Sequence, residues 1–431
     1  MAGRGGGAAR SRTPAATATA RGRRQTRASL PLDMLVDIAA RTDPATLVRC
    51  AATCVDMRRR VKDYTRLGGR LHLRRGDRFV LPLLRGHLIH TYKYGRAQRQ
   101  DHLSLLDTTA ADATTLRRVT GVEGFPLSSS NGLVLTRVTR SLRVCDPAAG
   151  RRRILPSNKL TFPVDVVGTE QDDAMTSYAL LVGDDDDDGA TAVGRQFHVV
   201  MAYLELSKHC RNVHFQTFSS EHGAWGCCNK IRVPNLQGSK LQLPLGTALV
   251  VGDTAHWLCL TNTGDYVLKI HVRMEQVTVM KLPESFPRSW WYHQLLATSS
   301  AGGCPIVLTA DDDKISAWAQ SKQTGQWKRQ PQVVIETETI LQFLQEAGGS
   351  RPPPSRWPVK YELKLLCFAE RSGTVLIKVL NNMSPLGYFW LNLQSMKIIR
   401  WFSDRGLEYA TGNIPYEMNL AAWIPTFSST L

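Results

Sequence analysis

Apolar side chains near the N-terminus recur at helical spacing. Leu32, Leu35, Val36 and Ala39 are separated by one or three positions, which places them on one side of a helix. Asp33 lies in the first turn, where the helix dipole favours an acidic side chain. This pattern predicts a helix that begins near Leu32.

Two further helices are predicted before residue 66. Asp43-Pro44 is typical of a helix start, because Asp caps the free amide groups and Pro fits the first helical position. Leu47, Val48 and Ala51 would form the apolar face of this second helix. The third helix is expected from Cys54 to Lys62, where basic residues suit a C-terminal end.

The remainder of the chain changes to short apolar runs separated by Gly, Pro, Asn and Asp, which is the pattern of β-strands. One helix is expected among them, near residues 338–346. The clearest expected strands are Gly132 to Leu135, Tyr178 to Val182, Phe197 to Leu206, Ala248 to Val251, Val375 to Leu380 and Tyr388 to Leu393.

A weak repeat runs through this strand-rich part. An alternating strand, a turn that ends in glycine and a second strand recur around Gly150, Gly223 and Gly325, and Phe389 to Trp401 repeats the pattern without the glycine. The intervals between these glycines are 73 and 102 residues. Each interval would hold roughly one and a half to two and a half propeller blades of about 40–50 residues. The repeat predicts a β-propeller or a related array of sheets.

These patterns predict an α+β chain of four parts. A disordered basic leader is expected at residues 1–28, a small three-helix domain at 29–66, a basic connecting segment at 67–110, and a large all-β, propeller-like domain at 111–425. Residues 1–30 contain seven arginines and no acidic residue, a composition that cannot bury a core.

The segment from Leu30 to Cys54 resembles the F-box family. The matching positions are Leu30, Pro31, Asp33, Leu35, Ile38, Leu47 and Cys54. Three features differ from the family pattern. Thr42-Asp43 stands where a Leu-Pro pair is usual, Thr53 replaces a Val, and Met57 replaces a Trp.

The strand-rich part resembles the domain that accompanies the F-box in large plant families, particularly those of grasses. The similar stretches are Ser130 to Val134, Val144 to Pro147, Phe218 to Trp225, Gly252 to Leu258 and Pro415 to Met418. They occur in the order found in that family.

This resemblance implies a substrate-recognition subunit of a Skp–cullin–F-box ubiquitin ligase. Such a receptor performs no bond chemistry and needs no cofactor. Its F-box binds a Skp-type adaptor and, through it, cullin, while the β-domain binds a target protein. Holding the target beside the ubiquitin donor raises the effective concentration of the two.

The residues expected to face the adaptor are apolar. They are Leu30, Pro31, Leu35, Val36, Ile38, Leu47 and Val48. Three short helices do not need this much apolar surface among themselves, so a partner would cover the excess. The alternative is that these side chains pack against the β-domain.

Other motifs in the sequence are weaker. It contains no phosphate-binding loop, zinc-protease motif or nucleophile elbow. His209, Cys210 and His214, and the adjacent Cys227-Cys228, lack the paired spacing of strong zinc sites. His256-Trp257 is interpreted as propeller core, and Trp290-Trp291 equally as core or as a recognition surface.

The charge distribution supports the main rival function. The net charge of +17 is concentrated in residues 1–30 and 58–99. Arginines of the leader, with Arg58, Arg59, Arg60 and Lys62, could bind nucleic acid or a nuclear import receptor. The alternative is therefore a scaffold or nucleic-acid-associated β-protein with a degenerate F-box, although nucleic acid is the less favoured partner.

The sequence also predicts where the chain works. It contains no apolar signal segment and no run long enough to span a membrane, so no membrane partner is expected. Its nine cysteines are scattered and odd in number, as expected for reduced thiols. We expect the protein in the cytoplasm, the nucleus or both.

Overall fold

The structure of the protein is a computed structural model. The residues that it describes are 30–41, 50, 53–66, 84–94, 99–107, 116–118, 122–139, 141–147, 150–157, 176–183, 196–287, 293–299, 303–311, 313–321, 323–346, 361–381, 384–403 and 410–417.

Two helices precede the β-sheets. Helix α1 spans Leu32–Arg41 and helix α3 spans Val55–Arg66, close to the first and third predicted helices. The predicted second helix lies outside the described residues. Arg60 Nη1 lies 2.8 Å from Asp33 Oδ1 and links α3 to α1. Because both side chains are exposed, this ion pair contributes little, and apolar contacts between the helices are the stronger link.

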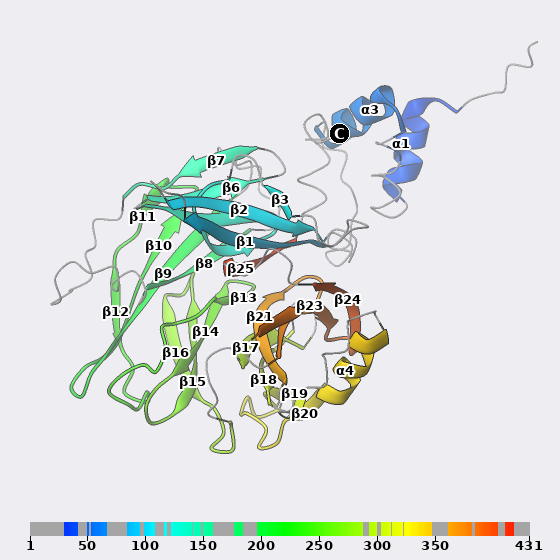
Figure 1. Ribbon diagram of the computed structural model, residues 1–431. Helices are drawn as coiled ribbons and strands as arrows, with labels where there is room; N and C mark the ends of the chain where they lie inside the picture. Colours follow the sequence, from blue (N-terminus) through cyan, green and yellow to red (C-terminus); the bar gives the residue numbers. More distant parts are fainter. Residues whose placement is uncertain are drawn as a thin grey trace, which may run out of the picture.

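Six antiparallel sheets follow one another around a central axis as the blades of a propeller (Figure 1). In each blade the strands are named from the innermost outward. Blade 1 consists of β25 (Ala410–Glu417), β1 (Leu84–Tyr94), β2 (Arg99–Asp107) and β3 (Leu116–Arg118). Blade 2 consists of β4 (Phe125–Ser130), β5 (Leu133–Val138), β6 (Ser141–Asp146) and β7 (Arg151–Ile154). Blade 3 consists of β8 (Thr176–Val182), β9 (Phe197–Leu206) and β10 (Arg211–Ser219), with β11 (Ala224–Trp225) and β12 (Asn229–Arg232) sharing the outer position.

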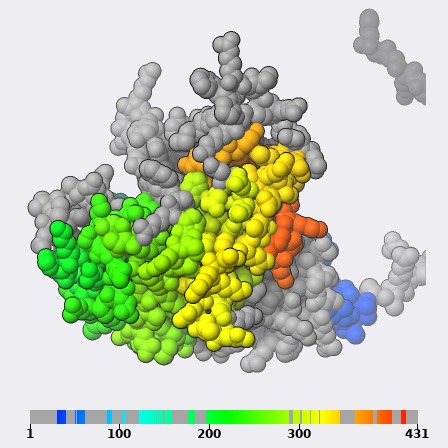
Figure 2. Space-filling model, turned by 90° about the horizontal axis from the view of Figure 1, so that it is seen from below, coloured from blue at the N-terminus to red at the C-terminus, as the bar shows by residue number. Residues whose placement is uncertain are grey.

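The remaining three blades each contain four strands. Blade 4 consists of β13 (Leu249–Val251), β14 (Thr254–Leu260), β15 (Asp265–His271) and β16 (Gln276–Lys281). Blade 5 consists of β17 (Gln294–Thr298), β18 (Pro305–Ala310), β19 (Lys314–Ala319) and β20 (Gln332–Glu336). Blade 6 consists of β21 (Tyr361–Ala369), β22 (Thr374–Asn381), β23 (Ser384–Asn392) and β24 (Lys397–Ser403). Figure 2 shows the later blades succeeding one another in green, yellow and orange.

The large β-domain is therefore a six-bladed propeller, which confirms the prediction of a propeller and adds the blade count. The sequence suggested roughly one and a half to two and a half blades in each interval between the marker glycines. The interval from Gly150 to Gly223 spans one blade, and the interval from Gly223 to Gly325 spans two. The predicted boundary at residue 111 also lies too late. Strands β1 and β2 fall within the expected connecting segment 67–110, so the propeller begins by Leu84.

The turn before the outermost strand explains why the repeat is weak. In blades 2 to 6 one residue of this turn has a left-handed backbone: Gly150 (φ 64°), Gly223 (67°), Glu275 (53°), Gly325 (67°) and Met396 (54°). Glycine adopts this conformation without steric cost, whereas other residues are strained in it. Two blades therefore keep the turn but lack the glycine that marks it in the sequence.

The core lies between neighbouring blades. The largest apolar cluster joins blades 4, 5 and 6, and helix α4 (Thr337–Glu346) adds Ile340 and Leu344 to it. Trp257 is fully buried, and its Nε1 donates to Ser177 Oγ at 2.8 Å. His256 is also buried, which confirms that His256-Trp257 belongs to the core. The Trp290-Trp291 pair lies outside the described residues. In the described part of the chain, every helix is too short or too polar to cross a membrane.

The closing strand β25 offers a test of how the ring is held. Ile414 of β25 is 2% exposed, whereas Ile399 of β24 is 41% exposed. We expect Ile414→Ala to lower the free energy of unfolding by about 3 kcal/mol, because a buried cavity forms. Ile399→Ala removes the same atoms and should cost at most about 0.5 kcal/mol. Urea denaturation followed by tryptophan fluorescence measures both. Equal losses would contradict the role of β25.

The left-handed turns offer a second test with opposite signs. Gly150→Ala should destabilise the protein by about 1 kcal/mol, because a Cβ there meets no atom within 4 Å and only the positive φ opposes it. Met396→Gly should stabilise by about 0.5 kcal/mol, because it relieves the same strain. Thermal unfolding of the two variants measures these shifts. Shifts of the same sign would mean that φ does not control these turns.

Candidate functional site

Helix α1 has a buried side. Val36 and Ala39 of α1 are 2% and 4% exposed, and Met57 and Val61 of α3 are 5% and 1% exposed. These four side chains belong to a hydrophobic cluster that also contains residues of blades 1 and 2. Met57, which stands where the F-box pattern has Trp, therefore fills a core position. This side of α1 is therefore used in packing the helices.

The opposite side of α1 is apolar and open. Leu30, Met34 and Ile38 follow one another at intervals of four residues, and they are 51%, 52% and 49% exposed. Val55 at the start of α3 is 66% exposed. Residues four apart lie next to each other on a helix surface. These four side chains, which we call the exposed row, are the exposed large apolar side chains described on α1, α3 and the residues just before α1.

The predicted adaptor-facing residues divide between the two sides. Leu30, Pro31 and Ile38 are exposed, and Leu35 is partly buried. Val36 was assigned to the wrong side, because it lies on the same face of α1 as buried Ala39. Leu47 and Val48 lie outside the described residues, as do Thr42 and Asp43.

Two members of the exposed row were missed by sequence analysis. Met34 could have been found, because it lies four residues after Leu30 and four before Ile38. Val55 gives no such signal, because its exposure depends on how α3 packs against α1. Thr53, where the F-box pattern has Val, is exposed, and its Oγ1 donates to the Cys50 carbonyl oxygen at 2.6 Å.

A second candidate site lies where the inner strands of four blades end. This axial pocket is lined by Ser128, Ser129, Ser130, Asn131, Thr247, Ala248, Phe368, Glu370, Arg371, Ile414, Pro415 and Glu417. Residues of two stretches noted in the sequence, Ser130 to Val134 and Pro415 to Met418, meet at this pocket. Asn131 and Gly132 form a tight turn with φ of 49° and 81°. Ser129 Oγ, close to this turn in the sequence, donates to the carbonyl oxygen of Pro415.

Glu370 joins two blades that are not neighbours. Its Oε1 accepts a hydrogen bond from Val250 N at 2.8 Å, which joins blade 6 to blade 4 without passing through blade 5. Glu417 of blade 1 accepts from Arg371 N at 3.1 Å and from Ser372 N at 2.7 Å. The turn between β21 and β22 is therefore held from two sides by hydrogen bonds to carboxyl groups.

The surroundings of these carboxyl groups favour their neutral forms. Both side chains retain some exposure to the pocket but are surrounded by protein atoms. Burial raises the pKa of Glu370 to about 8, and the nearby charge of Glu417 acts in the same direction. Burial also raises the pKa of Glu417. Glu370 is consequently protonated in much of the population near neutral pH.

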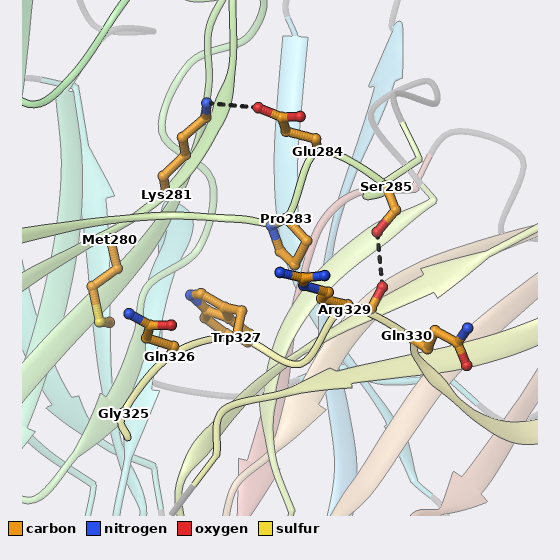
Figure 3. A pocket seen from close by; sticks show the side chains of 10 residues that line it. All are labelled: Met280, Lys281, Pro283, Glu284, Ser285, Gly325, Gln326, Trp327, Arg329 and Gln330. Carbon is orange, nitrogen blue, oxygen red and sulfur yellow. Dashed lines mark hydrogen bonds and ion pairs between the residues drawn. The ribbon is translucent and has the colours of Figure 1, made fainter. Parts of the chain in front are cut away.

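A third site is a groove between blades 4 and 5 (Figure 3). It encloses about 860 Å³ and is lined by Met280, Lys281, Pro283, Glu284, Ser285, Gly325, Gln326, Trp327, Arg329 and Gln330. The first five residues lie at or just after the end of β16, and the other five connect β19 to β20. Ser285 Oγ donates to the carbonyl oxygen of Arg329 at 2.8 Å and joins the two walls.

Instead of forming a metal site with His209 and Cys210, His214 takes part in a hydrogen-bond network. His214 Nε2 lies 2.8 Å from Glu205 Oε2, and Asn212 Nδ2 donates to the same oxygen at 2.8 Å. These hydrogen bonds lower the pKa of Glu205 to about 2. Within the described residues, no group of three His, Cys, Asp or Glu side chains is arranged to hold a metal ion.

Comparison with known proteins places the chain in a family. A family model described as a domain of unknown function, DUF7595, matches residues 123–424, which is more than half of the chain. This chain belongs to the DUF7595 family. The DUF7595 match includes β25 but begins after β3, so it excludes helices α1 and α3 and the three outer strands of blade 1. No curated protein matches the chain.

Several solved structures resemble the DUF7595 propeller at low identity. A protein from Lactobacillus plantarum is 11% identical, with a TM-score of 0.41, over 74% of this chain and 82% of that one. TolB from Acinetobacter baumannii is 11% identical, with a TM-score of 0.39, over 77% of this chain and 67% of TolB. The six-bladed fungal lectin from Aleuria aurantia is 15% identical, with a TM-score of 0.35, over 79% of this chain and 98% of the lectin. Likeness at this level carries no information about function.

The buried Glu370 carboxyl group of the DUF7595 propeller predicts a pH dependence. Between an unfolded pKa near 4.5 and a folded pKa of about 8, the folded state holds a proton at Glu370 that the unfolded state has lost. Stability should therefore fall as pH rises from 5 to about 8, by at most about 1.4 kcal/mol per pH unit, and then level off.

Glu370→Gln should remove much of this slope, because the amide stays neutral at every pH. Glu221→Gln, at an exposed position, serves as the control and should leave the slope unchanged. Urea denaturation at a series of pH values measures it. An unchanged slope in Glu370→Gln would show that Glu370 titrates normally.

Proposed function

We propose that this protein is the substrate-recognition subunit of a Skp–cullin–F-box ubiquitin ligase. The observation that carries the proposal is the exposed row of Leu30, Met34, Ile38 and Val55. Several exposed large apolar side chains within one small helical segment are typical of a surface that a partner covers. They lie in or beside the segment whose sequence resembles an F-box, the part of such receptors that binds a Skp-type adaptor.

The division of α1 into two faces supports adaptor binding over simple packing. Val36 and Ala39 already supply the inward side, so the exposed row is surplus to the folding of the helices. The four apolar side chains of the exposed row could form an interface core that suits an adaptor groove. The propeller would then hold the target, since a rigid ring of blades offers a wide surface for a protein partner.

Adaptor binding tests the proposal directly. The double variant Met34→Asp/Ile38→Asp places two charges in the exposed row without altering the buried side of α1. We expect the full chain to co-purify with a Skp-type adaptor and the double variant to lose this binding by at least about 100-fold, because each buried unpaired charge costs more than about 1.4 kcal/mol.

Arg59→Ala, at an exposed polar position of α3, is the matched control and should bind normally. Tryptophan fluorescence of each variant reports whether the propeller remains folded. Failure of the wild-type chain to bind the adaptor would reject the proposal. Salt-sensitive retention of that same chain on DNA or RNA would then favour the nucleic-acid-associated alternative.

A further inference from the structure

The groove between blades 4 and 5 combines apolar and cationic side chains. Met280 and Pro283 come from the wall at the end of β16, and Trp327 comes from the opposite wall. Figure 3 shows Trp327 in the middle of the labelled side chains, with Pro283 and the Arg329 guanidinium on one side of it and Gln326 and Met280 on the other. Trp, Met and Arg are the residues that interface cores favour.

The walls of the groove are held in place by contacts within the protein. Phe286 packs edge-on against Trp318, with ring centroids 5.4 Å apart. Gln320 Nε2 lies 3.1 Å from Met280 Sδ and connects the two blades beside the groove. The Ser285 to Arg329 hydrogen bond joins the walls at a second point. Because the protein's own contacts fix both walls, binding in the groove needs little ordering of the chain.

The charges of the groove are unbalanced. Lys281 Nζ lies 3.7 Å from Glu284 Oε1, and this pair leaves no net charge. Arg329 and its neighbour Lys328 are exposed and form no ion pair among the described residues. A guanidinium beside an aromatic ring and a proline can bind a carboxylate through two parallel hydrogen bonds. The surface is therefore complementary to a partner that carries negative charge beside apolar side chains.

We propose that this groove binds an extended acidic peptide segment of a protein partner. One apolar side chain of the peptide packs between Met280, Pro283 and Trp327, and a neighbouring Asp or Glu pairs with Arg329. If the protein is a ligase receptor, this partner is its target, and that identity of the partner rests on the proposed function. The peptide-binding property itself depends on the groove alone.

The first experiment selects ligands without assuming their sequence. A displayed library of random dodecamer peptides is panned on the immobilised full chain and, in parallel, on Trp327→Ala/Arg329→Glu. We expect peptides recovered only on the wild type to carry net negative charge and at least one large apolar residue. Recovery of no such groove-dependent peptides, or of peptides with neutral or positive net charge, would overturn the proposal.

The second experiment measures affinity with one selected peptide, labelled with fluorescein. Arg329→Glu, an exposed substitution that leaves the core intact, should weaken binding by at least about tenfold. Arg329→Lys should weaken it less, because it keeps the charge but loses the planar fork. Lys397→Glu makes the same charge reversal at an exposed site on β24 and should bind like wild type. An equal loss in Lys397→Glu would show that general charge attraction, not the groove, explains the binding.

The two proposals fail separately. Adaptor co-purification is measured on Trp327→Ala/Arg329→Glu, and groove-dependent peptide binding on Met34→Asp/Ile38→Asp. We expect each double variant to lose one property and keep the other. If the chain never binds the adaptor but binds acidic peptides through the groove, the receptor role is rejected and the peptide-binding proposal is supported. If it binds the adaptor and yields no groove-dependent peptide, only the groove assignment fails.

Discussion

The pairing of β25 with β1 is the interaction on which the rest of the propeller depends. These strands are antiparallel, with Leu88 opposite Ile414 and Gly86 opposite Tyr416. Strand β25 supplies the innermost position of a blade whose other strands come from the opposite end of the propeller sequence. Without it, blade 1 would lose its inner strand and blade 6 would lose its neighbour. One strand therefore closes the ring and completes the packing between the first and last blades.

The inner ends of the blades are joined by polar side chains as well as by apolar packing. Ser128 Oγ accepts from Leu180 N at 3.2 Å, between blades 2 and 3. Ser177 Oγ donates to the Gly246 carbonyl oxygen at 2.8 Å, between blade 3 and the approach to blade 4. Glu370 joins blade 6 to blade 4 across the inner end of blade 5. Short polar side chains suit this position, because inner strands converge there and their backbone groups need partners. The raised pKa of Glu370 is a consequence of this crowding.

Local patterns predicted the elements better than their assembly. Strand β9 has the bounds expected from its apolar run, Phe197–Leu206, because a buried strand needs little beyond its own side chains to be recognised. The blade count was not predictable, because Glu275 and Met396 occupy turns that glycine marks elsewhere, and because connections between strands differ in length. Both obstacles arise from tertiary packing, which tolerates strained turns and long insertions.

In the candidate sites, too, local sequence patterns indicate the residues, and tertiary packing decides how they are arranged. Leu30, Ile38 and Val36 were all expected to face an adaptor, but Val36 is buried, because the buried side of α1 is decided by where α3 lies. The groove could not have been predicted at all. Met280 and Trp327 are far apart in sequence, and they meet only because two neighbouring twisted blades bring their outer segments together.

The closure of blade 1 has a consequence for synthesis in the cell. Strand β1 ends at Tyr94, and its partner β25 begins at Ala410. At about 5–20 residues per second, a ribosome needs tens of seconds to make the intervening chain. During that time the edge of β1 that will receive β25 has no native strand to pair with. Unpaired strand edges bind other chains readily. The fold therefore keeps one strand edge of blade 1 without its native partner for most of the synthesis of the propeller.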